Sequence, residues 1–159
     1  MCSSDLEVYA VVRAGSRRFG LVLDSILNNE EIVVKPLHSA LKHLPMYSGA
    51  TILGDGRVAL ILNPDGIAQR ARIHFHAETI GDSQKKIFDA DQQLSVLRVR
   101  QCSGQLLGIP MVDVLRIVMC HECNLKRLGD QSYMMIGDQP TQILTTLKIG
   151  RAHVWNSSH

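Results

Sequence analysis

Short runs of apolar, strand-forming residues alternate along the chain with Gly, Asp and Ser positions that favour turns. This pattern covers segments 8–12, 19–24, 31–35, 49–62, 94–99 and 105–109. The clearest case is SGATILGDGRVALIL at 48–62, where two apolar runs flank Asp55-Gly56. Such a pair is typical of a tight hairpin turn that needs positive φ at both central residues. The pattern therefore predicts an all-β protein.

Helical signals are few and local. Residues 37–44 are expected to form a short helical or irregular stretch that ends at Pro45, and Asn63-Pro64 is expected to cap a helix that starts near Asp65. Residues 69–93 are polar and predict a linker between two β-rich lobes. Five short strands with tight turns indicate a small barrel, because closing the sheet removes exposed edges.

Composition narrows the class of partner. The 159 residues carry a formal net charge of +2, and basic and acidic residues are interspersed, so the charge favours neither nucleic acid nor an anionic membrane. Aromatic residues make up only 4%, so the core must be built from Val, Ile, Leu and Met. No apolar run approaches the ~20 residues of a membrane span, and no signal peptide is visible, so we expect a cytoplasmic protein without direct membrane insertion.

No cluster of residues indicates catalysis. Cys120-His121-Glu122-Cys123 contains a CxxC pair, but a structural metal site needs a second ligand pair. His74 and His76 are interpreted as linker residues rather than as a zinc or catalytic pair. Glu30 and Glu31 are adjacent, so in a strand they point to opposite faces. We therefore predict no catalytic, cofactor-binding or metal-binding residue and no cofactor.

Two segments resemble parts of a known protein family. They occur in the same order as in that family, and the match needs no insertion or deletion. RFGLVLDSILNNEEIVVKPL at 18–37 and SGATILGDGRVALIL at 48–62 are similar to the regulatory domain of the chemotaxis histidine kinase CheA, the part that looks like the coupling protein CheW. The resemblance covers about residues 8–68. The family usually has Asp where this chain has Asn63, a change expected to keep a helix-capping side chain. A weaker resemblance, centred on LGIPMVDVLRIV at 107–118, indicates the opening of another CheW-like domain, with Val114 facing inward.

The resemblance implies the fold. CheW-like domains consist of two SH3-like five-stranded subdomains, so we expect two small SH3-like β-barrels joined by a polar linker with short helices. Residues 7–68 would be the second subdomain of one CheW-like domain, with 18–62 closing as one compact barrel. Residues 69–93 would be the linker, and residues 94–147 the first subdomain of a following domain.

The resemblance also implies a function in protein recognition. In the family, this domain docks to CheW and to chemoreceptors (methyl-accepting chemotaxis proteins) and passes receptor state to the parent kinase domain in two-component signalling, at membrane-associated arrays. The ATP-binding domain of the kinase has Asn and Gly-rich boxes, and none of these boxes appears in this sequence. The residues expected to bind partners are Lys35 and four apolar positions that are expected to be exposed near the turns of the first lobe: Ile26, Leu27, Met46 and Tyr47.

Two alternatives remain open at this point. One is a free-standing CheW-type coupling protein, and the other is an unrelated SH3-like binding module. The near-neutral charge and the few aromatic residues argue against a nucleic-acid-binding version of the latter.

The two ends, MCSSDL at 1–6 and KIGRAHVWNSSH at 148–159, are similar to translated sequencing adapters in opposite orientations. We therefore expect neither end to belong to the fold, and Trp155 to lie outside any core.

Overall fold

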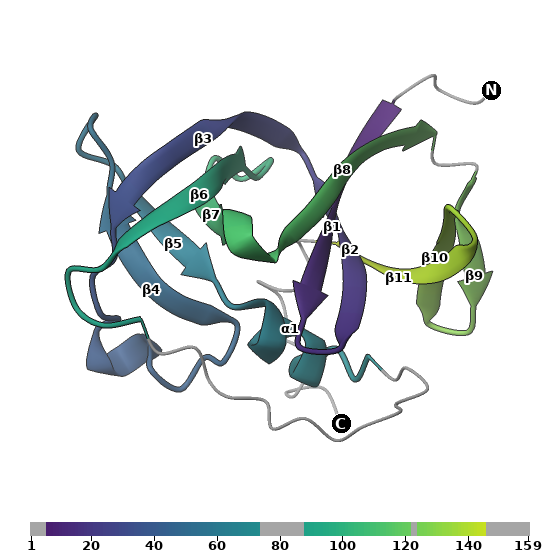
Figure 1. The fold of residues 1–159 in the computed structure, drawn as a ribbon, viewed down its shortest axis with the longest axis horizontal. Helices are drawn as coiled ribbons and strands as arrows, with labels where there is room; N and C mark the ends of the chain where they lie inside the picture. Colours follow the sequence, from purple (N-terminus) through teal and green to yellow (C-terminus); the bar gives the residue numbers. More distant parts are fainter. Residues whose placement is uncertain (1–5, 74–87, 122–123, 146–159) are drawn as a thin grey trace.

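The computed structural model describes residues 6–73, 88–121 and 124–145, which form mostly β-strands (Figure 1). The strands are β1 (Leu6–Ala14), β2 (Arg17–Leu23), β3 (Ser25–Val33), β4 (Tyr47–Ile52), β5 (Val58–Leu62), β6 (Gln93–Arg100), β7 (Leu106–Pro110), β8 (Val114–His121), β9 (Lys126–Leu128), β10 (Gln131–Ile136) and β11 (Gln139–Thr145). One α-helix, α1 (Pro64–Arg70), and two 3-10 turns, η1 (Ser39–Leu41) and η2 (Met111–Asp113), connect them. The predicted all-β class is confirmed.

The strands form two strongly curved sheets that lie side by side (Figure 1). The six-stranded sheet has the order β8-β1-β2-β11-β10-β9, and the five-stranded sheet has the order β3-β6-β7-β5-β4. The curvature of each sheet agrees with the expected SH3-like barrels.

Each sheet combines strands from both halves of the chain, which corrects the expected strand partners. β1 and β2 pair with β8 and β11, whereas β3 to β5 pair with β6 and β7. Residues 18–62 therefore do not close as one barrel, because β2 lies in one sheet and β3 to β5 lie in the other. Local patterns predicted strands that correspond to β1 to β7 but not β8 to β11, and they carry no information about which distant strand each one joins.

The pairing of strands from the two halves of the chain follows an internal two-fold pattern. Val12 pairs with Val114 in one sheet as Val99 pairs with Ile26 in the other, and in both places a register shift follows. The shift leaves Leu115 of β8 and Leu27 of β3 without a partner residue. The two halves, 6–62 and 93–145, thus place one hairpin in one sheet and their remaining strands in the other.

The parallel pairings repeat this pattern. β5 runs parallel to β7 with Ile61 opposite Gly108, and β11 runs parallel to β2 with Ile143 opposite Gly20. A Cβ built on Gly20 would lie 2.5 Å from the Ile143 Cδ1 atom, and one built on Gly108 would lie 3.0 Å from the Ile61 Cδ1 atom. Glycine therefore lets an isoleucine cross the strand at the corresponding place in both sheets.

The largest hydrophobic cluster lies between the two sheets, and a smaller one lies within each. The central core takes buried side chains from both sheets and from α1; among them are Val12, Phe19, Leu97 and Ile109. The five-stranded sheet encloses a cluster around Ile61 and Val96, and the six-stranded sheet encloses one around Tyr9 and Met134. The central core makes the two barrels one packing unit.

The predicted hairpin at 48–62 is present, but its turn differs from the expected type. The last strand pair is Ile52 with Val58, and the Leu53 N–H donates to the Arg57 carbonyl at 2.8 Å. Gly56 has φ of 82°, whereas Asp55 is not among the described residues with positive φ. The Asp55 carboxylate instead accepts hydrogen bonds from the Arg57 backbone N–H at 3.0 Å and its guanidinium at 2.7 Å. Asp55 thus stabilises the turn through its side chain rather than through a left-handed backbone.

Helix α1 begins where expected, but Asn63 does not cap it as expected. Its side chain makes no hydrogen bond to the first turn; its Nδ2 donates to the Pro45 carbonyl at 3.0 Å. The Asn63 backbone N–H donates to the Met46 carbonyl at 2.8 Å. Asn63 therefore ties the helix start to the 45–46 loop, a bond that a carboxylate could not donate.

Other expectations have mixed outcomes. β3 begins at Ser25, whereas the sequence predicted a start at residue 31. The polar residues before 31 face solvent, and this part of the strand is held by pairing with β6. Ile73 of the expected linker is buried in the central core, and Val114 is half-buried against that core, as predicted. Within the described ranges, no helix combines the length and apolar character needed to cross a bilayer. His74, His76, Cys123, Trp155, residues 1–5 and residues 148–159 lie outside the described residues.

Gly66 of α1 is the glycine with the closest backbone neighbour. A Cβ at this position would lie 1.8 Å from the Pro45 carbonyl oxygen, so the helix and the loop would have to separate. We expect Gly66→Ala to lower the free energy of unfolding by about 2 kcal/mol or more, in the range of overpacking. The matched control is Gly54→Ala, whose Cβ would meet nothing within 4 Å. Urea denaturation of both variants tests this; equal stabilities would contradict the packing described.

Candidate protein-binding surface

Met46, one of the five predicted binding residues, is buried with 3% of its surface exposed. It belongs to the central core. The apolar side chain beside Pro45 therefore packs inside the fold instead of projecting from a turn. The expectation that Met46 is an exposed apolar position is wrong.

Three further predicted residues are half-buried. Ile26 and Tyr47 pack against the central core, and Leu27 packs against the cluster inside the five-stranded sheet. Burial raises the pKa of the Tyr47 hydroxyl above its ordinary value, because the charged phenolate is poorly solvated there. These three side chains have at most one edge available to a partner.

Lys35, the fifth predicted residue, is exposed and lies where β3 meets β4. Its backbone N–H donates to the Ala50 carbonyl at 2.8 Å, and its carbonyl accepts from the Ala50 N–H at 3.0 Å. Its ammonium group forms an ion pair with Asp91 at the surface. Lys35 thus marks the end of the line along which the five-stranded sheet closes.

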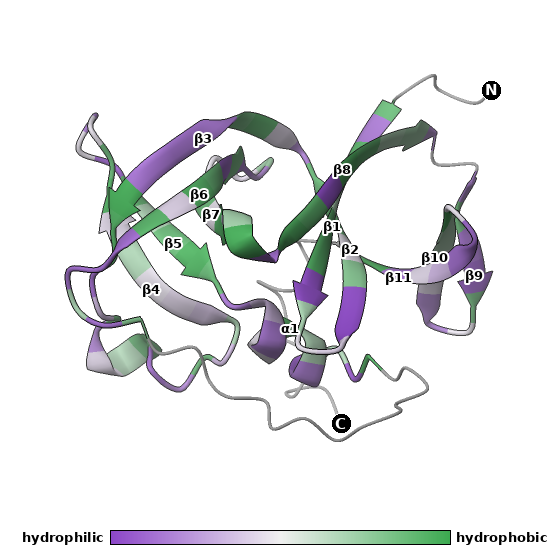
Figure 2. Ribbon diagram, viewed as in Figure 1, coloured by the Kyte–Doolittle hydropathy of each residue, from purple (hydrophilic) through white to green (hydrophobic). Residues whose placement is uncertain are grey.

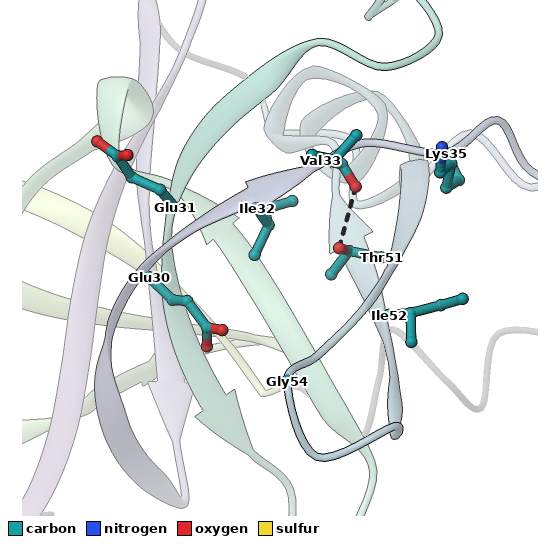
Figure 3. A pocket seen from close by; sticks show the side chains of 8 residues that line it. All are labelled: Glu30, Glu31, Ile32, Val33, Lys35, Thr51, Ile52 and Gly54. Carbon is teal, nitrogen blue, oxygen red and sulfur yellow. Dashed lines mark hydrogen bonds between the residues drawn. The ribbon is translucent and has the colours of Figure 1, made fainter.

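That line, which we call the β3–β4 seam, contains a shallow hollow of about 310 Å³ (Figure 3). The Thr51 Oγ1 donates to the Val33 carbonyl at 3.0 Å and bridges the two strands beside it. The residues that line the hollow are Glu30, Glu31, Ile32, Val33, Lys35, Thr51, Ile52 and Gly54. The hollow therefore lies where β3 and β4 are neighbours but are joined by few backbone hydrogen bonds.

The seam exposes apolar side chains that the sequence interpretation missed. Ile52 is 68% exposed and Val58, its partner across the hairpin, is 60% exposed. Val33 on β3 is also exposed. Their strand positions could have given a signal, because they alternate with the buried Thr51 and Ala59 on the same two strands. Apolar anchors surrounded by polar groups are typical of a protein-binding surface.

Charged groups border this apolar patch. Glu30 and Glu31 point to opposite faces of β3, as predicted (Figure 3). Arg98 Nη1 donates to Glu30 Oε2 at 2.6 Å, with the two side chains 16% and 29% exposed. At the hairpin, the side-chain hydrogen bond from Arg57 holds the pKa of the Asp55 carboxyl below its ordinary value.

The described residues provide little reactive chemistry. Among residues 6–73, 88–121 and 124–145, no group of three or more His, Cys, Asp or Glu side chains is arranged to hold a metal ion. The hydrogen bond to Asp24 raises the pKa of the Cys102 thiol, which disfavours the reactive thiolate. The exposed apolar patch with its charged border is therefore the candidate binding surface of the described residues.

Comparisons with known proteins agree with this interpretation. Residues 2–72 match the family model of the CheW-like domain. The chain is 50% identical over 61 residues to the chemotaxis protein CheA of Listeria monocytogenes, which is 38% of this chain and 10% of that protein. It is 43% identical over 58 residues to CheA of Rhizobium meliloti, which is 36% of this chain and 8% of that protein.

A solved structure extends the similarity beyond the first half. The crystal structure of the scaffolding protein TtCheW from Thermoanaerobacter tengcongensis aligns with a TM-score of 0.55, over 90% of this chain and 92% of that one, at 12% identity. At that identity the likeness shows the fold alone. The chain spans about a tenth of the length of the curated relatives that it matches. Residues 2–72 are thus similar to the CheW-like domain, and the fold of the described residues resembles that of TtCheW.

We expect the Glu30–Arg98 ion pair to contribute more to the free energy of unfolding than the exposed Lys35–Asp91 pair. Glu30→Gln removes the charge that faces a largely buried guanidinium whose Nε atom has no hydrogen-bond partner among the described residues. We expect it to lower the free energy of unfolding by roughly 1–3 kcal/mol. The control is Asp91→Asn in the exposed Lys35–Asp91 pair, for which a change under about 0.5 kcal/mol is expected. Equal effects in guanidinium denaturation would count against a structural role for the Glu30–Arg98 pair.

Proposed function

We propose that the chain is a docking part of a chemotaxis sensor histidine kinase, because residues 2–72 match the family model of the CheW-like domain. In this proposal it binds the coupling protein CheW and chemoreceptors, and it passes their state to the parent kinase domain at cytoplasmic, membrane-associated arrays. The observation that carries the proposal is the 50% identity over 61 residues to a CheA protein.

The seam supports docking rather than chemistry. Ile52, Val58 and Val33 provide an exposed apolar patch, and Lys35 and Glu31 provide charges at its border. A partner that covers the apolar residues would gain most of its affinity there, while the charges would set orientation and association rate. Lys35 is retained from the sequence prediction; for Ile26, Leu27 and Tyr47, binding remains a prediction that depends on their exposed edges.

A second candidate is a free-standing coupling protein of the CheW type. It is supported by the fold likeness to TtCheW, which covers nearly the full length of both chains. The two candidates differ in their expected partner. The kinase part binds purified CheW more tightly, whereas a coupling protein binds the regulatory domain of a CheA kinase more tightly. Isothermal titration of the chain against each partner separates them.

The seam predicts which substitutions weaken CheW binding. We expect Ile52→Glu to raise the Kd for CheW about ten-fold or more, because it places a charge in the apolar patch. Lys35→Glu should raise the Kd by about three-fold, mainly through slower association at low salt.

The matched control is Val112→Glu in η2, an exposed apolar residue on a different element. Surface plasmon resonance with immobilised CheW measures all three variants. A Kd that stays the same for both Ile52→Glu and Lys35→Glu would contradict the seam as the docking site. Loss of binding by the control as well would indicate that another surface is responsible.

A further inference from the structure

Strand β8 presents an apolar face to solvent that its counterpart β3 does not. Leu115, Ile117 and Met119 alternate along β8 and are 48%, 45% and 68% exposed. The internal two-fold pattern relates Ile117 to Asn29 and Met119 to Glu31, because Ile117 pairs with Ala10 as Asn29 pairs with Leu97. Figure 2 shows β8 green over most of its length and β3 purple over its central part. At these two positions the outward face is thus polar in β3 and apolar in β8, whereas Leu27, the counterpart of Leu115, is also apolar and is half-buried.

The difference between β3 and β8 indicates whether the fold itself requires apolar residues on the outward face of this strand. If the outward face of this strand needed apolar residues for packing, β3 would carry them as well. Asn29 and Glu31 show that polar residues are compatible with the fold there. The apolar residues on β8 therefore call for a different explanation, and burial against another molecule provides one.

The two edges of the six-stranded sheet also differ. β9 is three residues long, and two of the three, Lys126 and Arg127, are cationic. Short, charged edges resist pairing with another strand. β8 is eight residues long, and among the described strands it pairs with β1 alone. Its one Lys, Arg, Asp or Glu residue is Arg116. An edge of this kind is prone to accept a further strand.

The order of residues in β8 is self-complementary when two copies run antiparallel about Ile117. In this register, Leu115 of one copy lies opposite Met119 of the other, twice, and the two Ile117 side chains lie opposite each other. All three directly opposed pairs on the exposed face are then apolar, which favours cross-strand contact. Arg116 falls opposite Val118, so the two cations do not face each other. Such a contact is isologous and closes at two copies, with the cationic β9 edges at the two ends.

We propose that a second copy of this chain covers β8, by antiparallel β8–β8 pairing centred on Ile117. The pairing joins two six-stranded sheets into one continuous sheet and buries Leu115, Ile117 and Met119 across the two-fold axis. It uses a surface separate from the β3–β4 seam, so it does not depend on the proposed docking to CheW.

Sedimentation velocity of the full chain between about 1 and 200 μM tests the proposal. We expect a dimer whose Kd changes little between low and high salt, because its contacts are apolar. The double variant Ile117→Asn, Met119→Glu gives β8 the residues that β3 carries at the related positions. It should raise the dimer Kd at least ten-fold while circular dichroism shows an unchanged fold. The matched control, Asn29→Gln with Glu31→Gln on β3, should leave the dimer Kd unchanged.

Disulfide cross-linking tests the register separately. In a background with Cys2, Cys102, Cys120 and Cys123 replaced by Ser, Ile117→Cys should cross-link with itself, because the two side chains meet on the axis. Met119→Cys alone should not, but a mixture of Leu115→Cys and Met119→Cys chains should. A monomer at 200 μM, a dimer unaffected by the β8 double variant, or self-linking of Met119→Cys as efficient as that of Ile117→Cys would overturn the proposal. The proposal would also be overturned if the chain is monomeric and the β8 double variant loses binding to CheW.

Discussion

The largest hydrophobic cluster of this protein lies between its two sheets, and the position of every other element follows from it. Side chains of β1 and β2 from one sheet, β6 and β7 from the other, and α1 all enter this central core. Strands β1 and β6 each contribute residues to the central core and to the cluster of their own sheet, so the three clusters share the same strands. The β3–β4 seam and the exposed face of β8 are surfaces that this arrangement leaves to solvent.

Strand exchange between the halves explains how that core is built. Each hairpin, β1–β2 or β6–β7, accepts the strand that follows the other hairpin, and each receives a parallel strand opposite a glycine. The two halves therefore close each other's sheets. Because the pattern is nearly two-fold, differences between related positions reveal what is particular to each half. Asn29 and Glu31 on β3 face water, whereas Ile117 and Met119 on β8 expose apolar surface.

Local features of this fold could be predicted from the sequence, whereas long-range pairing could not. The hairpin at 48–62 and the start of α1 after Asn63-Pro64 depend on residues close together in the chain. The inward position of Val114 was implied by the family resemblance instead. The pairing of β2 with β11 depends on Gly20 meeting Ile143, more than a hundred positions away, and the local pattern does not contain that relation. Among the residues predicted to bind partners, Lys35 is exposed, whereas Met46 is buried. An apolar residue beside a proline turn has the same local signature whether it faces the core or the solvent. Ile52 and Val58 were missed because a strand with one exposed face shows alternation without indicating which face is buried.

The central claim is that the two sheets fold as one unit through their shared core. Hydrogen exchange of a Leu97→Ala variant tests it most directly, because Leu97 lies in β6 of the five-stranded sheet and is buried in the central core. Truncating a buried leucine costs about 2–5 kcal/mol. The account predicts that amides of β1 and β2, in the other sheet, lose the same protection free energy as amides of β6 and β7. Loss of protection confined to the five-stranded sheet would contradict it.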